Sequence, residues 1–198
     1  MKKTLLLSAL AALLFIQCGQ EKDPYLIKKG EVGHLTTTVT MKQVDSIFAQ
    51  DSLVWLNPVQ DALGTQGEVE IYEKGGKKLL MLSPHSETDP DSNIGNVQVF
   101  DERFITETGL NINSTFGDLK ANYEIESVET TLNAVVIFIK DSDIFITIDK
   151  RELPENVRYT LDKKVELTQI PDSAKFKYFM IGWDEEVEKE ETETETEE

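Results

Sequence analysis

The sequence predicts an α+β fold made mainly of an antiparallel sheet with two short helices. Short segments of alternating apolar and polar residues recur along the chain, separated by turn residues. Two further segments place apolar residues at helical spacing after a threonine. Residues 30–183 are enough for one domain with a substantial core and too few for two ordinary domains. We therefore expect a single globular domain over 30–183.

The start of the chain is typical of a bacterial secretion signal. Lys2 and Lys3 precede the apolar run Leu5–Ile16, which is too short to span a bilayer and suits a signal peptide. Cys18, the only cysteine of the chain, follows directly. We expect residues 1–17 to be removed and Cys18 to carry lipid, since two or three acyl chains hold a protein firmly on a membrane. The alternative is a simple signal peptide followed by an incidental cysteine.

Two segments flank the expected domain. Residues 18–29 have little periodicity and are predicted to be a tether from the lipid, and residues 184–198 carry ten acids against Lys189, a net charge of -9. Such a run should be a disordered tail, which either repels anionic surfaces and collects cations weakly or only keeps the chain soluble.

The whole chain is strongly acidic, and loss of the signal peptide changes its formal charge from -17 to -19. We therefore expect no nucleic acid partner, because binding the phosphate backbone needs clustered basic residues.

The first predicted strands form a hairpin. Residues 68–73 alternate between apolar and polar side chains, 74–76 supply a glycine turn, and 78–82 return. Residues 96–100 alternate again. The predicted order along the chain is therefore strand, turn, strand and a third strand.

The second half of the chain also contains predicted strands separated by turns. The continuously apolar run 134–139 predicts a central strand covered on both faces, and 140–143 turn it into a strand over 144–148. In the last strand, which ends near Trp183, Phe176, Tyr178 and Met180 alternate with lysines and are expected to share one face.

The two helix signals are alike. Thr40 precedes an amphipathic stretch to residue 48, and Thr115 precedes another to residue 123; Gln43 and Asp118 lie three residues after the capping threonines. A glycine lies upstream of each, at 33 and 109. This similarity predicts two repeats, 30–105 and 106–183, each a short helix followed by antiparallel strands. Chance similarity between two capped turns is the alternative.

These features carry a resemblance to known families. The box Phe15, Ile16, Gln17, Cys18 resembles bacterial lipoprotein signals, although a small residue is usual where Gln17 stands and a leucine where Phe15 stands. The pattern of glycine, threonine cap, helix and strands resembles SmpA/OmlA-like envelope lipoproteins and tandem-repeat relatives such as the β-lactamase inhibitor protein. Over its whole length, including VGHLTTTVTMKQVDSIF and TGLNINSTFGDLKANY, the chain resembles uncharacterised lipoproteins of Bacteroidota. The resemblance implies an envelope location and no particular activity.

Residues suited to catalysis are few. His34 and His85 are the only histidines and are interpreted as surface or loop residues, and no nucleophile elbow, zinc-protease motif or phosphate loop is present. Asp89, Asp91 and Asn93 have the spacing of a calcium loop, but Ile94 and Phe100 stand where glycine and glutamate are required, so a polar loop explains them better. We expect no catalytic, cofactor or metal site.

The sequence therefore predicts a lipid-anchored protein of the outer membrane, on its periplasmic face or the cell surface. Cys18 is the one assigned site, as the lipid attachment residue. The predicted role is non-enzymatic, binding another envelope protein or assisting assembly. The alternative is an envelope glycan hydrolase that uses a pair of carboxylates.

Overall fold

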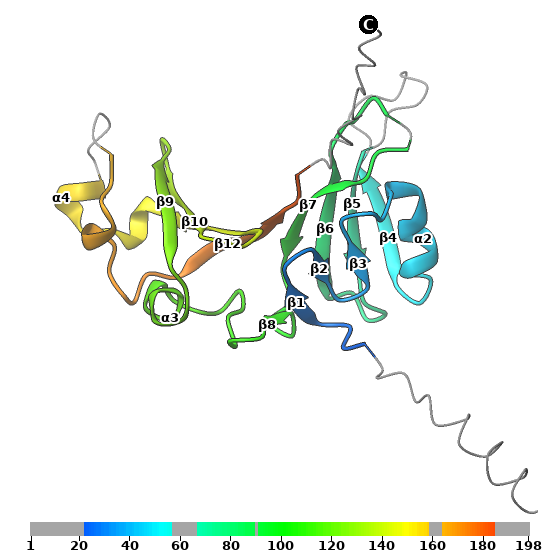
Figure 1. Cartoon of the computed structure of the whole chain (residues 1–198), viewed down its shortest axis with the longest axis horizontal. Helices are drawn as coiled ribbons and strands as arrows, with labels where there is room; N and C mark the ends of the chain where they lie inside the picture. Colours follow the sequence, from blue (N-terminus) through cyan, green and yellow to red (C-terminus); the bar gives the residue numbers. More distant parts are fainter. Residues whose placement is uncertain (1–21, 57–66, 90, 159–163, 185–198) are drawn as a thin grey trace, which may run out of the picture.

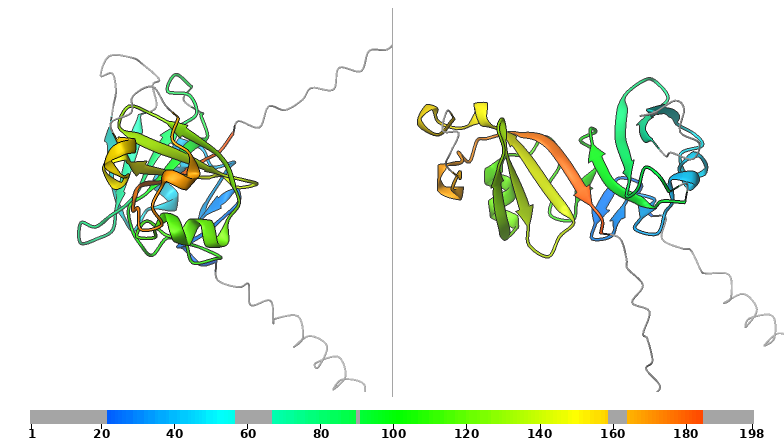
Figure 2. Two further views of the ribbon diagram at one scale, coloured as in Figure 1. Left: turned by 90° about the vertical axis from the view of Figure 1, so that its left-hand side faces the viewer. Right: turned by 90° about the horizontal axis from the view of Figure 1, so that it is seen from above.

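The computed structural model describes residues 22–56, 67–89, 91–158 and 164–184 (Figure 1). Within these ranges the chain forms an eight-stranded sheet, a small four-stranded sheet and several short helices. The predicted α+β class, dominated by antiparallel strands, is confirmed. Figure 2 shows the fold from the side and from above, and the view from above separates it into two lobes.

The large sheet is antiparallel throughout, in the order β4-β5-β6-β7-β12-β11-β10-β9. Both predicted hairpins are present, as β5–β6 and β10–β11. Its strands are β4 (Ser52–Leu56), β5 (Glu68–Tyr72), β6 (Lys78–Pro84), β7 (Ile94–Val99), β9 (Ile125–Thr130), β10 (Ala134–Ile139), β11 (Ile144–Asp149) and β12 (Phe176–Gly182).

The strand order is symmetric about its centre. Four strands follow the first helix and end at β7, four strands follow the second helix and end at β12, and β7 pairs with β12. The two halves form the two lobes of Figure 1, joined at this pair. The same succession of elements therefore occurs twice along the chain.

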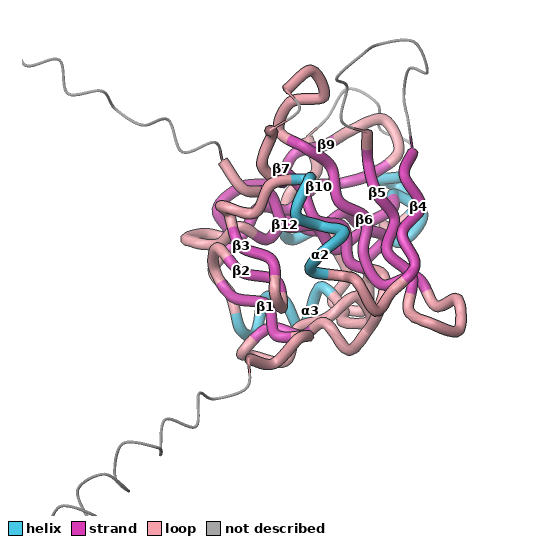
Figure 3. The backbone as a smooth tube through the Cα atoms, turned by 90° about the vertical axis from the view of Figure 1, so that its right-hand side faces the viewer, coloured by secondary structure: helices cyan, strands magenta, loops and turns pink. Residues whose placement is uncertain are grey.

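The two expected helices begin at their capping threonines. Thr40 precedes a 3-10 turn, η2 (Met41–Gln43), which continues into α2 (Val44–Ile47), and Thr115 precedes α3 (Phe116–Asn122). Figure 3 shows α2 beside β1–β3, on the half of the sheet that contains β4–β6. Three short helices that were not predicted lie between β11 and β12: η3 (Lys150–Glu152), α4 (Glu155–Arg158) and η4 (Leu167–Gln169).

The small sheet corrects the predicted tether. Its order is β3-β2-β1-β8, with β1 (Leu26–Lys28), β2 (Glu31–Val32), β3 (Leu35–Thr36) and β8 (Ile105–Thr106). The parallel pairing of β1 with β8 buries Ile27 in the core, at 2% exposure. The folded region therefore begins before residue 30, and residues 18–29 are not all tether.

One continuous core joins both halves, with buried residues from both capped helices, both sheets and the loops between them. The last strand departs from the predicted alternation. A register shift opposite Thr147 and Ile148 turns Phe176 and Phe179 inward and leaves Tyr178 41% exposed. Tyr178 and Met180 alternate on one face as predicted, but Phe176 lies on the other face, because the bulge inserts a residue between Phe176 and Tyr178.

Candidate functional site

The second face of the large sheet is the candidate site. The buried residues of α2, α3 and β1–β3 all belong to the core on one face, whereas the opposite face has partly or fully exposed side chains on all eight strands of the described chain. We call this opposite face the open face. The strand register places one residue from each strand in a central row: Val54, Glu70, Met81, Gln98, Met180, Phe145, Phe138 and Ser127.

The C-terminal half of the open face is apolar. Phe138 and Phe145 stack across β10 and β11 with ring centroids 5.7 Å apart, and Met180 is the register partner of Phe145 on β12. Val136 and Tyr178 continue this surface in the next row, on either side of Thr147. Val136 and Phe138 are only partly buried, so β10 is not covered on both faces as predicted. An apolar surface of this kind on a sheet is typical of a protein-binding site.

A glycine keeps this surface continuous where the two halves join. A Cβ atom built on Gly182 of β12 would lie 3.1 Å from Cε1 of Phe145, closer than ordinary van der Waals contact. The ring of Phe145 therefore lies against the backbone of β12, a position that only glycine leaves open. The aromatic surface thus reaches the seam between β12 and β7.

The N-terminal half of the open face combines the apolar side chains of Val54 and Met81 with polar side chains that are held by hydrogen bonds. The Glu70 carboxylate accepts bonds from Lys78 Nζ at 2.6 Å and from the Tyr72 hydroxyl at 2.7 Å. These bonds lower the pKa of Glu70 and raise the pKa of Tyr72. Ser83 similarly donates to Glu68 at 2.8 Å. An acidic, ordered region therefore lies beside the apolar one.

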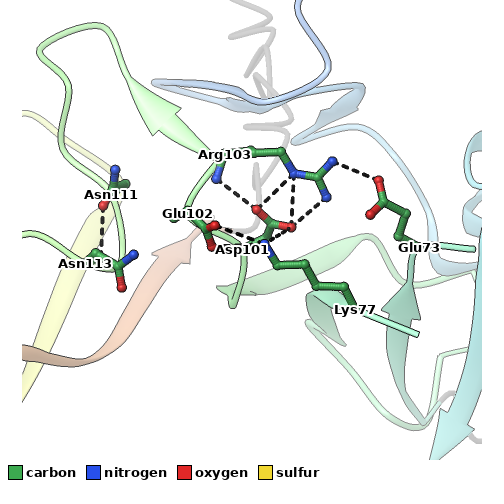
Figure 4. A network of polar contacts seen from close by, with 7 residues as sticks. All are labelled: Glu73, Lys77, Asp101, Glu102, Arg103, Asn111 and Asn113. Atoms are coloured by element: carbon green, nitrogen blue, oxygen red, sulfur yellow. Dashed lines mark hydrogen bonds and ion pairs between the residues drawn. The ribbon is translucent and has the colours of Figure 1, made fainter. Parts of the chain in front are cut away.

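An ion-pair network supports this polar half from the end of β7 (Figure 4). The fully buried Asp101 carboxylate binds Arg103 Nη2 at 2.6 Å and Lys77 Nζ at 3.2 Å, and Arg103 Nη1 binds Glu73 at 2.8 Å. Burial raises the pKa of Asp101, but the hydrogen bonds from Arg103 and Lys77 outweigh it and hold the value at about 2. The network links the β5–β6 hairpin to the loop after β7, so its role is structural. Figure 4 also shows the turn in which the Asn113 N–H donates to Asn111 Oδ1 at 2.9 Å.

Asp51 is an acid whose pKa is raised, first by burial and then by the charge of Glu73. Glu73 has a lowered pKa because Arg103 binds it. A glycosidase needs one protonated and one ionised carboxyl group. This pair is therefore where the hydrolase alternative is best tested, although Glu73 already binds Arg103.

The other residues singled out from the sequence lie apart from the open face. Cys18 falls outside the described residues, and His34 is exposed on the β2–β3 turn. The ring of His85 packs against Gly95. Asp91 binds Lys42 at 2.6 Å, and Asp89 accepts the Asp91 N–H at 2.9 Å, so both serve the polar loop. In the described ranges no group of His, Cys, Asp and Glu side chains is placed to hold a metal ion.

Comparisons with known proteins give little further information. Neither a family model nor a curated protein matches the chain. One solved structure is similar, the uncharacterized protein yfeY from Escherichia coli: it is 16% identical, covers 78% of this chain and 97% of its own, and has a TM-score of 0.47. Within the described residues no helix has the length and apolar character needed to cross a bilayer.

Proposed function

We propose that this chain is a lipid-anchored, non-enzymatic protein of the cell envelope that binds another envelope protein through the open face. The signal segment and Cys18 support a location on the outer membrane. The observation that carries the binding role is the partly exposed apolar row of Phe138, Phe145 and Met180, with Tyr178 41% exposed beside it, because a soluble sheet ordinarily covers such residues or replaces them with polar ones.

The charge of the open face defines the partner. Glu70 lies in the same row as the apolar side chains, and Glu129 pairs with Val136 at the outer edge. Acids therefore flank the apolar centre from both sides, Glu70 in an ion pair with Lys78. The partner surface that fits is an apolar patch bordered by lysine or arginine, with the charges guiding encounter and the apolar contacts supplying affinity.

Site-specific photo-crosslinking in intact cells tests this proposal. A benzophenone side chain at Tyr178, 41% exposed on the open face, is compared with one at Leu167, 37% exposed on η4, which is not one of the strands that form this face. We expect a discrete crosslinked protein from position 178 that is absent from position 167 and is lost with Met180→Lys. The same products from both positions, or products unaffected by Met180→Lys, would refute the open face as the binding site.

The hydrolase alternative has its own test. If Asp51 and Glu73 form a catalytic pair, the purified protein should hydrolyse envelope glycan, and Asp51→Asn should abolish turnover without unfolding the protein. We expect no turnover from either protein. Saturable hydrolysis that is lost in Asp51→Asn would overturn the non-enzymatic role.

A further inference from the structure

A basic pocket lies at one corner of the large sheet, where the composition of the chain gives no reason to expect one. It is open, has a volume of about 780 Å³, and is lined by Leu132, Asn133, Asp149, Lys150, Arg151, Arg158 and Lys177. Four of these residues are cations and one is an acid, in a chain whose formal charge is -17. The ends of three neighbouring strands, β10, β11 and β12, bring them together.

The one acid of the pocket is already neutralised. Arg151 donates to both oxygens of Asp149, from Nε at 3.1 Å and from Nη2 at 2.9 Å, and Lys177 Nζ lies 3.3 Å from Oδ2. These bonds hold the pKa of Asp149 well below its usual range. Asp149 therefore positions Arg151 and Lys177 and leaves excess positive charge in the pocket.

Lys150 and Arg158 have no acidic partner among the described residues. Lys150 is only 5% exposed; its backbone N–H donates to the carbonyl of Asn133 at 3.0 Å, but its side chain makes no hydrogen bond or ion pair with a described residue. Arg158 Nη2 donates to two neutral carbonyls, of Arg151 at 2.6 Å and Leu153 at 3.0 Å, and its Nε is buried without a partner. The Lys150 ammonium reaches the pocket surface, and the charges of Lys150 and Arg158 are balanced by no described acid, so a bound anion can compensate them.

We propose that this pocket binds an organic phosphate, with the phosphate group against Lys150 and Arg158. Lysine and arginine are the residues that proteins use for phosphate, as a point charge and as a fork of donors. The volume exceeds that of inorganic phosphate and falls in the range of small-molecule sites. Leu132, 70% exposed at the rim, offers the remainder of the ligand an apolar contact. The site is independent of the open-face binding role.

Calorimetry with the full chain in mild detergent tests the proposal, with glycerol 3-phosphate as the probe and glycerol as its uncharged counterpart. Flotation of the Cys18→Ala chain, which lacks the proposed acyl anchor, with phosphatidylglycerol vesicles against phosphatidylcholine vesicles in the absence of detergent distinguishes a lipid headgroup from a free phosphate. Lys150→Met and Arg158→Gln are compared with Lys140→Met, which removes one exposed lysine that is paired with Glu124 outside the pocket. Thermal melting establishes that each variant is folded.

We expect saturable binding of glycerol 3-phosphate or of phosphatidylglycerol vesicles, none of the uncharged counterparts, and at least tenfold weaker binding in Lys150→Met and Arg158→Gln. Lys140→Met should bind like the parent chain. Binding of the vesicles alone would assign the phosphate to a lipid. If the folded parent binds neither probe, or if a folded Arg158→Gln binds as tightly as Lys140→Met, the pocket is not a phosphate site.

Discussion

Thr40 and Thr115 occupy the same place in the two halves of the fold. Each precedes a short helix, and each forms an isolated antiparallel bridge with the residue just before the last strand of its half, Thr40 with Asn93 and Thr115 with Lys175. The following residues repeat the match, since Met41 N–H donates to Ser92 O at 3.0 Å and Phe116 N–H donates to Ala174 O at 2.9 Å. The helix starts are therefore fixed to β7 and β12 by equivalent contacts.

The caps differ in detail, which predicts unequal costs. At the second helix, the Asp118 carboxylate accepts the Thr115 N–H at 2.8 Å, and the Asp118 N–H donates to the Thr115 hydroxyl at 3.3 Å. At the first helix, the Gln43 side chain accepts the Thr40 N–H at 2.9 Å. Thr115→Ala should lower the free energy of unfolding by about 1 kcal/mol and Thr40→Ala by about half of that. Urea denaturation measures both, with Thr38→Ala as a control outside the caps. A larger loss for Thr40→Ala would contradict this ranking.

Gly33 is expected to be far less replaceable than other turn glycines. Its φ is +56°, and a Cβ there would overlap the carbonyl oxygen of Pro24. Gly33→Ala should therefore cost roughly 3 kcal/mol of stability or prevent folding. Gly76, with φ +90° and nothing within 4 Å of its Cβ position, is the matched control and should lose only about 1 kcal/mol. Equal melting temperatures for the two alanine variants would contradict this, because they would mean that the backbone at Pro24 can move away from the added methyl group at little cost in free energy.

Asp101 makes the stability of the fold depend on acid pH. Its pKa is lowered from 3.8 to about 2, so the stabilisation is complete above the unfolded value and is lost as the pH falls toward the folded one. Asp101→Asn should lose roughly 2 kcal/mol at neutral pH, because a bond to a charged group is removed. Its stability should then change less between pH 4 and 2. Asp45→Asn, at an exposed position of α2, is the control, and an unchanged pH profile for Asp101→Asn would refute this role.

Local signals were sufficient for the hairpins and the helix starts, and they failed where distant segments decide the structure. The β5–β6 turn and the capping threonines are specified by residues within a few positions of one another. By contrast, β1 and β8 are two or three residues long and exist because they pair across nearly eighty positions, so no window of sequence reveals them. Propensity and periodicity describe local preference, which such tertiary pairing overrides.

The candidate sites were missed for a related reason. The apolar residues of β10 predicted burial on both faces, but only the register with β11 and β12 shows that Phe138, Phe145 and Met180 form one partly exposed row. The basic pocket draws cations from three places in the sequence, and the chain charge of -17 conceals them. The alternation of lysines with aromatic residues in the last strand was a usable signal for the pocket, because it placed the cation of Lys177 within that strand.

Cys18 is predicted to be the anchor. Cys18→Ala should move the protein from the membrane pellet to the soluble fraction of lysed cells, because the acyl chains are its strong attachment to the bilayer. Gln20→Ala, two residues further on, should remain in the pellet after a high-salt wash. If Cys18→Ala also resists that wash, another part of the chain holds the membrane and lipid attachment at Cys18 is not the anchor.

The end of the folded domain can be located by truncation. The Trp183 side chain is 4% exposed within the core, and its backbone N–H donates to Gly95 O at 2.8 Å. A chain that ends at Gly182 loses both contacts and should be less stable by roughly 3 kcal/mol. A chain that ends at Asp184 keeps them and removes the acidic run, which contains only Val187 to bury, so its stability should change by less than about 0.5 kcal/mol. Thermal melting of the two truncated chains against the full chain measures the difference. A marked loss in the chain that ends at Asp184 would mean that the acidic run packs on the fold, contrary to the prediction of a solvated tail.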